Sequence, residues 1–258
     1  MSDLRSDDTS EARAALGICR VPAAPTTGRG VRVAVIDSGW DRTIYDSRVS
    51  GGTAFVDCTD DFGLACSTDV HDRIGHGTAV TDLLLQVAPA VTVVPIRVFY
   101  QRLETSLAVL LAAIEFAVAR QCVLVNLSVG TLRDDTLRRL YLACDSALRS
   151  GTIIVAAADG IDGWSYPAVF TPVLGVGHKA GLSCHEISYQ ADDALEFGAC
   201  AIGQSARGLG GVVRSYNGAS FAAPIVVGHL ARFVEVGAPT DIHRLRQWVQ
   251  SRANVCAS

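Results

Sequence analysis

The chain has 258 residues, of which 49% are hydrophobic and 19% are charged. This composition is typical of a folded globular protein and excludes a disordered chain. The formal net charge is −4, without a block of basic residues, so we expect neither nucleic acid nor a membrane as a partner.

The sequence shows no targeting segment and no membrane span. The first thirty residues lack an apolar run, which argues against a secretory signal and favours the reducing cytosol. The longest apolar stretch, residues 107–118, is interrupted by Glu115 and is too short to cross a bilayer.

The eight cysteines form no CxxC pair and accompany no histidine at zinc-finger spacing. Several of them lie inside apolar segments, so we expect free and mostly buried thiols. Cys58 and Cys66 flank one loop and would pair only under oxidising conditions.

The predicted elements alternate along the chain. Residues 1–29 form a polar arm with a short helix at residues 11–16, and the Val- and Ile-rich residues 31–36 form a buried strand. Residues 50–75 are rich in Gly, Asp and Cys, which favours a long surface loop. Further strands are expected at residues 91–99, 122–128, 152–158 and 172–176, and helices at residues 78–86, 105–120, 134–149, 221–236 and 240–252.

This alternation of buried strands and helices predicts an α/β fold with a mainly parallel central sheet and helices on both faces. No linker and no internal repeat interrupts it, so we expect one domain over residues 30–258, preceded by the arm of residues 1–29. Sheets of this kind bind their ligands at the carboxyl ends of the strands.

Three short segments carry residues suited to catalysis. VAVIDSG places Asp37 at the end of a strand, GHGT places His76 between glycines at a helix start, and NGASFAAP places Ser220 at the start of an apolar helix. Each residue alone is more often a turn former or a helix cap than a catalytic group. Their joint occurrence in the order Asp, His, Ser favours a catalytic triad.

On these motifs the chain resembles the subtilase family of serine peptidases, over about residues 30–235. The resemblance implies a subtilisin-like fold in which Ser220 is the nucleophile and His76 is the general base. Asp37 would hold the imidazole in the correct tautomer, and the backbone N–H of Ser220 would bind the oxyanion.

The segment LVNLSVG, residues 124–130, is similar to the strand that lines the family's substrate groove. We expect an extended peptide to pair with this strand by main-chain hydrogen bonds. The predicted substrate-binding residues are Leu127, Ser128, Val129, Gly130 and Ala157. Their apolar and small side chains favour an apolar or medium-sized residue before the cleaved bond.

The chain departs from the family pattern at the oxyanion site. The family places an asparagine after the strand at residues 152–158, where this chain has Asp159 or Gly160. Gly160 has no side chain, and Asp159 would donate a hydrogen bond only when protonated. Loss of this donor in subtilisin itself costs about 10²–10³ in kcat, so we expect a slow enzyme.

No metal and no cofactor is expected. The usual calcium-binding loop of the family has no counterpart, and Asp60, Asp61 and Asp69 are interpreted as a solvated acidic loop. His71 and Asp72 precede the histidine motif and are interpreted as loop residues, with contact to the leaving-group side of a substrate as the alternative.

Three functions are compatible with these residues. The first is a serine endopeptidase acting on a peptide or protein, with trimming of a peptide precursor as a dedicated role. The second is a weak or inactive subtilase-fold protein that binds a peptide or a partner protein, which the missing asparagine favours and the complete triad disfavours. The third is acyl transfer to an amine, giving ligation or macrocyclisation through the same acyl-enzyme.

Overall fold

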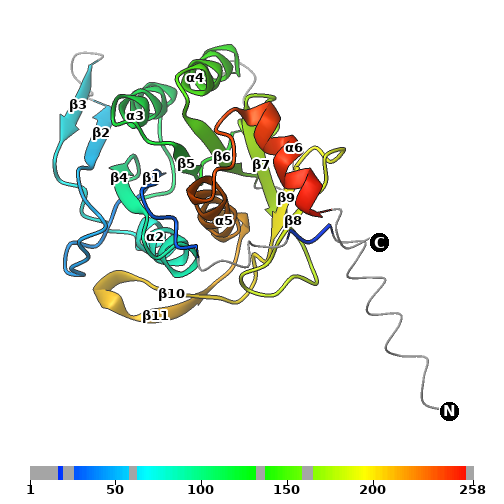
Figure 1. Ribbon diagram of the computed structural model, residues 1–258. Coiled ribbons are helices and arrows are strands. Elements are labelled where there is room, and N and C mark those ends of the chain that lie inside the picture. Colours follow the sequence, from blue (N-terminus) through cyan, green and yellow to red (C-terminus); the bar gives the residue numbers. More distant parts are fainter. Residues whose placement is uncertain (1–16, 20–25, 58–62, 132–136, 159–164, 254–258) are drawn as a thin grey trace.

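The computed structural model describes residues 17–19, 26–57, 63–131, 137–158 and 165–253 (Figure 1). Its strands are β1 (Arg32–Asp37), β2 (Thr53–Asp57), β3 (Leu64–Ser67), β4 (Thr92–Arg97), β5 (Leu124–Leu127), β6 (Ile153–Ala157), β7 (Val173–His178), β8 (Ile187–Tyr189), β9 (Phe197–Ala199), β10 (Gln204–Arg207) and β11 (Val213–Tyr216). The helices are α2 (His76–Val87), α3 (Leu107–Ala119), α4 (Leu137–Arg149), α5 (Ala223–Glu235) and α6 (Ile242–Ala253), with the short 3-10 helices η2 (Leu209–Gly211) and η3 (Ala219–Phe221).

Nine of the strands form one sheet, in the order β3-β2-β4-β1-β5-β6-β7-β9-β8. All neighbours pair in parallel except β2 with β3 and β8 with β9, at the two edges. The inner strands β5 and β6 are buried along their whole length, as expected for parallel strands that are covered on both faces. The predicted α/β fold with a mainly parallel sheet is confirmed.

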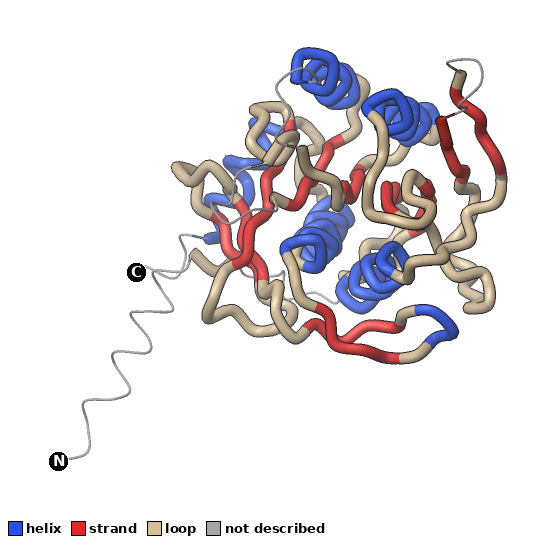
Figure 2. The backbone as a smooth tube through the Cα atoms, turned by 180° about the vertical axis from the view of Figure 1, so that it is seen from behind, coloured by secondary structure: helices blue, strands red, loops and turns tan. Residues whose placement is uncertain are grey.

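Helices cover both faces of this sheet (Figure 1). Side chains of α2, α5 and α6 form one apolar core with one face, and those of α3 and α4 form a second core with the other face. The strands β10 and β11 pair only with each other, and Figure 2 shows this ribbon apart from the main sheet and beside α2.

The sheet changes winding direction at β1. From β1 the chain passes through β2, β3 and α2 to β4 on one side of β1, and then through α3 to β5 on the other side. The carboxyl end of β1, at Asp37, is therefore the point where α/β sheets open a crevice for ligands.

Two sequence expectations about the elements were wrong. Residues 50–75 are not one loop, because β2 and β3 form an edge hairpin there that pairs with β4. The strands β8 to β11 were not predicted at all. They have three or four residues each, and β11 is mostly exposed, so they lack the apolar runs by which the inner strands are recognised.

The described parts of the N-terminal arm pack on the domain. Cys19 donates its N–H to Ile187 of β8 at 2.9 Å, which extends the sheet edge. The Glu235 carboxylate at the end of α5 accepts the N–H groups of Thr27 and Gly28 at 2.6 and 2.7 Å. The expected helix at residues 11–16 lies outside the described residues, and the boundary between arm and domain stays a prediction.

The six cysteines within the described ranges are free thiols, while Cys58 and Cys256 lie outside them. Burial raises the pKa of Cys19 and Cys144 to about 12 and that of Cys122 to about 11, so these three thiols are inert at neutral pH.

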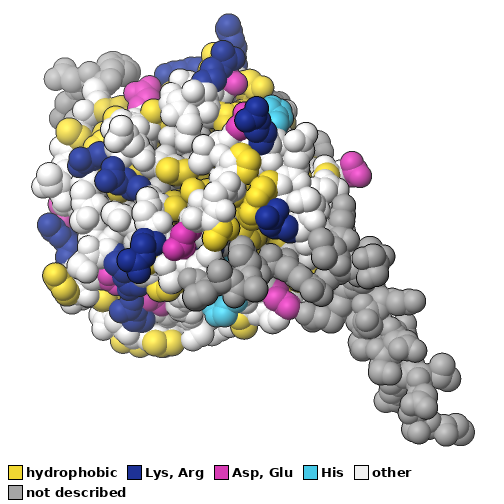
Figure 3. Space-filling model, in the orientation of Figure 1, with side chains coloured by type: hydrophobic (Ala, Val, Ile, Leu, Met, Phe, Trp, Pro, Cys, Tyr) yellow, Lys and Arg dark blue, Asp and Glu magenta, His cyan; other side chains and the backbone are white. Residues whose placement is uncertain are grey.

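None of the helices in the described segments is long and apolar enough to cross a membrane. On the face drawn in Figure 3, Lys and Arg side chains are scattered among Asp and Glu and do not gather in one basic area.

One buried histidine makes folding sensitive to pH. His229 of α5 is 2% exposed, and its Nε2 donates to the carbonyl of His185 at 2.6 Å. Its Nδ1 is buried without a hydrogen-bond partner among the described residues. Burial lowers its pKa from 6.5 to about 4, because the charged imidazolium would lose its hydration.

We expect His229→Gln to remove part of the acid sensitivity of folding. Below pH 6.5 the unfolded chain binds a proton at His229, whereas the folded protein does so only below a pKa of about 4. The unfolding free energy of the wild type therefore falls as pH decreases through this window, by about 3 kcal/mol in total. Urea unfolding at several pH values measures the difference. The exposed His243→Gln is the control, and superimposable profiles of wild type and His229→Gln would contradict the account.

Candidate active site

The site is centred on Asp37 at the carboxyl end of β1. Its side chain is fully buried, and one carboxylate oxygen accepts the N–H of Ser38 at 2.7 Å. The two carboxylate oxygens lie 2.8 and 3.0 Å from Nδ1 of His76, the first residue of α2. This contact holds Nδ1 as the donor and leaves Nε2 to face a reacting group.

The contact between Asp37 and His76 requires a very close approach of α2 to β1. A Cβ atom at Gly77 would lie 2.5 Å from the Gly39 carbonyl oxygen, so only glycine fits. The N–H of Gly77 instead donates to the Ser38 hydroxyl at 2.8 Å. The GHGT motif is thus explained by backbone packing at the first turn of the helix.

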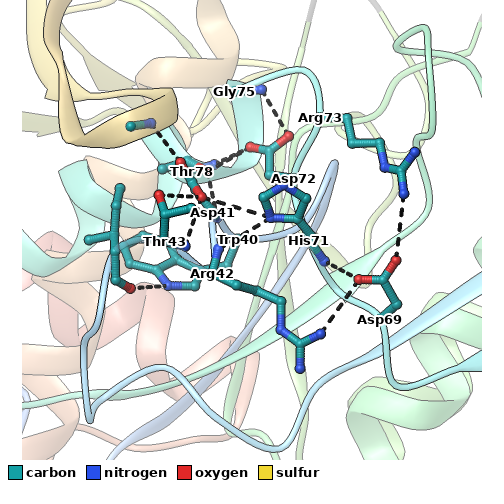
Figure 4. A network of polar contacts seen from close by, with 12 residues as sticks. Trp40, Asp41, Arg42, Thr43, Asp69, His71, Asp72, Arg73, Gly75 and Thr78 are labelled. Carbon is teal, nitrogen blue, oxygen red and sulfur yellow. Dashed lines mark hydrogen bonds and ion pairs between the residues drawn. The ribbon is translucent and has the colours of Figure 1, made fainter.

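Asp72 fixes the start of α2, a role that the sequence interpretation missed. Its carboxylate is fully buried and accepts the N–H groups of Ile74, Gly75 and Thr78 and the Thr78 hydroxyl, at 2.7–2.9 Å (Figure 4). These N–H groups have no partner within the helix, and the negative charge is stabilised at the helix N-terminus. The signal in the sequence was an acidic residue four positions before His76.

A second buried carboxylate, Asp41, joins three segments around the site. It accepts hydrogen bonds from the N–H and hydroxyl of Thr43 and, at 2.6 Å, from the N–H of Gly210 in η2. Its own N–H donates to the Thr78 hydroxyl at 3.0 Å. Burial acts to raise the pKa of Asp41, but the hydrogen bonds from Gly210 and Thr43 outweigh it and hold the pKa below its ordinary value.

Ser220 lies in η3, a short turn that leads into α5. The preceding Gly218 has a φ of 127°, in the region that favours glycine. The ring of Phe221 lies 4.9 Å from the His76 ring and 5.0 Å from that of Tyr216. The backbone carbonyl of Ser220 accepts the Ser128 hydroxyl at 3.4 Å. Ser220 and Phe221 thus contact the end of β5 and the first residue of α2, respectively.

Three of the predicted groove residues, Ser128, Val129 and Gly130, directly follow β5, whereas Leu127 ends β5 and Ala157 ends β6. Ser128 accepts a hydrogen bond from the Asn126 amide at 3.1 Å, and Val129 and Gly130 line a cavity of about 430 Å³. The other apolar residues lining this cavity are Leu103, Leu107, Leu110, Leu140 and Tyr166. The side chains of Leu127 and Ala157 lie in the two cores, so these residues offer only backbone to a peptide.

The remaining predicted sites lie partly outside the described residues. Asp159 and Gly160, at the expected oxyanion position, lie in segment 159–164, which the structure does not describe. Asp60 and Asp61 of the acidic loop lie in segment 58–62, which is also outside the described residues. Within the described ranges, no group of three His, Cys, Asp or Glu side chains is placed to hold a metal ion. Asp69 of that loop is paired with arginines.

Comparison with known proteins places this arrangement in one family. The family model described as Subtilase family matches residues 28–255. Subtilisin from Bacillus pumilus is 28% identical over 90% of this chain and 86% of its own length. Subtilisin E from Bacillus subtilis (strain 168) is 30% identical over 80% of this chain but only 55% of its own length, so the chain spans about half of that relative.

A solved structure supports the same assignment at the level of the fold. The crystal structure of a cold adapted subtilisin-like serine proteinase superposes with a TM-score of 0.71, at 21% identity, over 89% of this chain and 84% of that one. The predicted subtilisin-like fold is thereby confirmed. Since the family model matches most of the sequence, the chain belongs to the subtilase family of serine peptidases.

Proposed function

We propose that this protein is a serine endopeptidase that cleaves peptide bonds through an acyl-enzyme on Ser220. The observation that carries the proposal is the hydrogen bond between the buried Asp37 and Nδ1 of His76 at 2.8 Å, together with the ring of Phe221, the residue after Ser220, at 4.9 Å from the same imidazole. A buried carboxylate that orients an imidazole next to a serine is the arrangement that activates a weak hydroxyl nucleophile.

Each residue has a defined step in the proposed reaction. His76 takes the proton of the Ser220 hydroxyl as the oxygen attacks the peptide carbonyl, and returns it to the leaving amine. Asp37 stabilises the imidazolium that forms between these steps. Water then attacks the acyl-enzyme, with His76 again accepting a proton, and releases the second product and free Ser220.

The groove beside β5 supports a peptide as the substrate. Ser128, Val129 and Gly130 continue β5 beyond its last ladder pair, where an extended peptide can add by main-chain hydrogen bonds. The cavity of about 430 Å³ beside them is lined mainly by apolar side chains. An apolar side chain on the acyl side of the cleaved bond fits this lining.

The proposal includes low turnover and a dedicated role in processing a peptide precursor. Neither Asp159 nor Gly160 has a side-chain amide that could donate to the oxyanion, so the donor in this proposal is the backbone N–H of Ser220. A slow enzyme suits a single cleavage better than general digestion. Its location in the cytosol stays a prediction from the sequence.

Variants of the three residues test the proposed reaction. We expect Ser220→Ala and His76→Ala to lower kcat by about 10⁴–10⁶, and Asp37→Asn by about 10⁴, because the three act as one unit. The measurement is cleavage of a fluorogenic peptide with an apolar residue before the scissile bond. Ser146→Ala, an exposed serine on α4, is the matched control. Equal rates for wild type and Ser220→Ala would rule out the proposed nucleophile.

Asp72 is expected to act on the same reaction through the position of His76. Asp72→Asn replaces two accepting oxygens by one and turns an amide donor toward backbone N–H groups, so the first turn of α2 shifts. We expect the resulting displacement of His76 to lower kcat/KM by about 10- to 100-fold, because a misplacement of about 1 Å can cost about 10²-fold. Asp145→Asn, which removes a partly exposed carboxylate from α4, should leave kcat/KM unchanged. A wild-type kcat/KM in Asp72→Asn would show that this cap does not position the base.

A further inference from the structure

Three arginine side chains share one carboxylate in the loop before His76. Asp69 lies 3.7 Å from a guanidinium nitrogen of Arg42, 4.0 Å from one of Arg73 and 3.5 Å from one of Arg97. Figure 4 shows Arg42 and Arg73 reaching Asp69 from two sides. The N–H of His71 also donates to Asp69 at 3.1 Å. This hydrogen bond and the guanidinium groups outweigh the effect of burial and hold the pKa of Asp69 below its ordinary value.

Two of the three arginines are available to a ligand. The side chains of Arg42 and Arg73 are 59% and 66% exposed, and their distances to Asp69 are too long for hydrogen bonds. Arg97 is buried, donates to the His71 carbonyl at 2.8 Å and lies over the ring of Tyr100. Arg42 and Arg73 therefore keep their donors for a further acceptor.

The other carboxylates of this loop do not compete for these donors. Asp41 and Asp72 are 2% and 0% exposed, and their oxygens are occupied by backbone N–H and hydroxyl groups. Among the residues that the structure describes, Asp69 is the one carboxylate within ion-pair distance of Arg42 and Arg73. The Asp69 carboxylate thus lies near the exposed guanidinium groups of Arg42 and Arg73 and the buried guanidinium group of Arg97.

Arg42 and Arg73 lie outside the groove cavity, whose lining includes residues 103–107 after β4 as well as residues 129–131 after β5. In the sheet, β1 stands between β4 and β5. The groove residues 128–130 follow β5, Asp37 ends β1, and Arg97, which contacts Asp69, ends β4. Arg73 stands three residues before His76, and a peptide whose acyl side fills this cavity has its leaving-group residues free for contact with Arg42 and Arg73.

We propose that Arg42 and Arg73 bind an acidic side chain on the leaving-group side of the cleaved bond, so that the substrate is a peptide with Asp or Glu after this bond. The inference rests on the proposed function and adds the chemical class of the substrate. Guanidinium groups bind carboxylates through paired, charge-assisted hydrogen bonds. Since the chain as a whole carries −4, attraction of an acidic segment has to come from such a local group of cations.

Paired peptides test this inference. One fluorogenic peptide carries Glu at the first three positions after the cleaved bond, and its counterpart carries Gln there. We expect the wild type to show a kcat/KM ratio of Glu to Gln peptide of about 5 or more, the fold-change of a good exposed ion pair. The ratio should fall to about 1 in the Arg42→Ala/Arg73→Ala variant, and it should shrink in high salt.

Controls separate this inference from the proposed function. Arg149→Ala removes an exposed arginine of α4 that pairs with Asp145, and its Glu to Gln ratio should equal that of the wild type. Binding of both peptides to Ser220→Ala, followed by fluorescence anisotropy, reports recognition without cleavage. A preference for Glu in binding, without cleavage by the wild type, would overturn the proposed function alone. A ratio of 1 in the wild type, or one unchanged in the double variant, would overturn the role of the arginines.

Discussion

The structure depends on the close contact between the end of β1 and the start of α2. Asp37 and His76 can meet because Gly77 lets the helix backbone approach the Ser38–Gly39 turn. The contact is held from outside by Asp72, whose buried carboxylate is bound by the N–H groups of the first turn. The catalytic pair is therefore a consequence of how one helix is capped and packed, and not only of which two side chains are present.

The sequence predicted most of the central sheet and the three segments of the site. Buried strands such as β1, β5 and β6 were recognisable because both faces are covered and their residues are continuously apolar. The edge hairpin β2–β3 and the ribbon β10–β11 were missed, since short strands at the surface carry no such run. The capping role of Asp72 was also missed, because it depends on a loop conformation that no periodic pattern encodes.

The proposed substrate contacts divide into two groups. The residues after β5 would offer backbone and an apolar cavity to the acyl side of a peptide, and the segment between β1 and α2 would offer exposed guanidinium groups to its leaving-group side. The carbonyl of Ser220 accepts the hydroxyl of Ser128 after β5, and the next residue, Phe221, packs on His76 of α2. In this proposal the missing side-chain donor at Asp159 or Gly160 lowers the rate of the reaction, while recognition of the substrate is spread over both sides of the bond.

The most direct test of the account is reaction of the folded protein with a fluorophosphonate, followed by mass spectrometry of the intact chain and of its peptides. Such a probe reacts with a serine only where a neighbouring base activates it. The account predicts one phosphonyl group per chain, located on Ser220, and no adduct in His76→Ala. Folded protein without an adduct at high probe concentration, or an adduct on another serine, would contradict it.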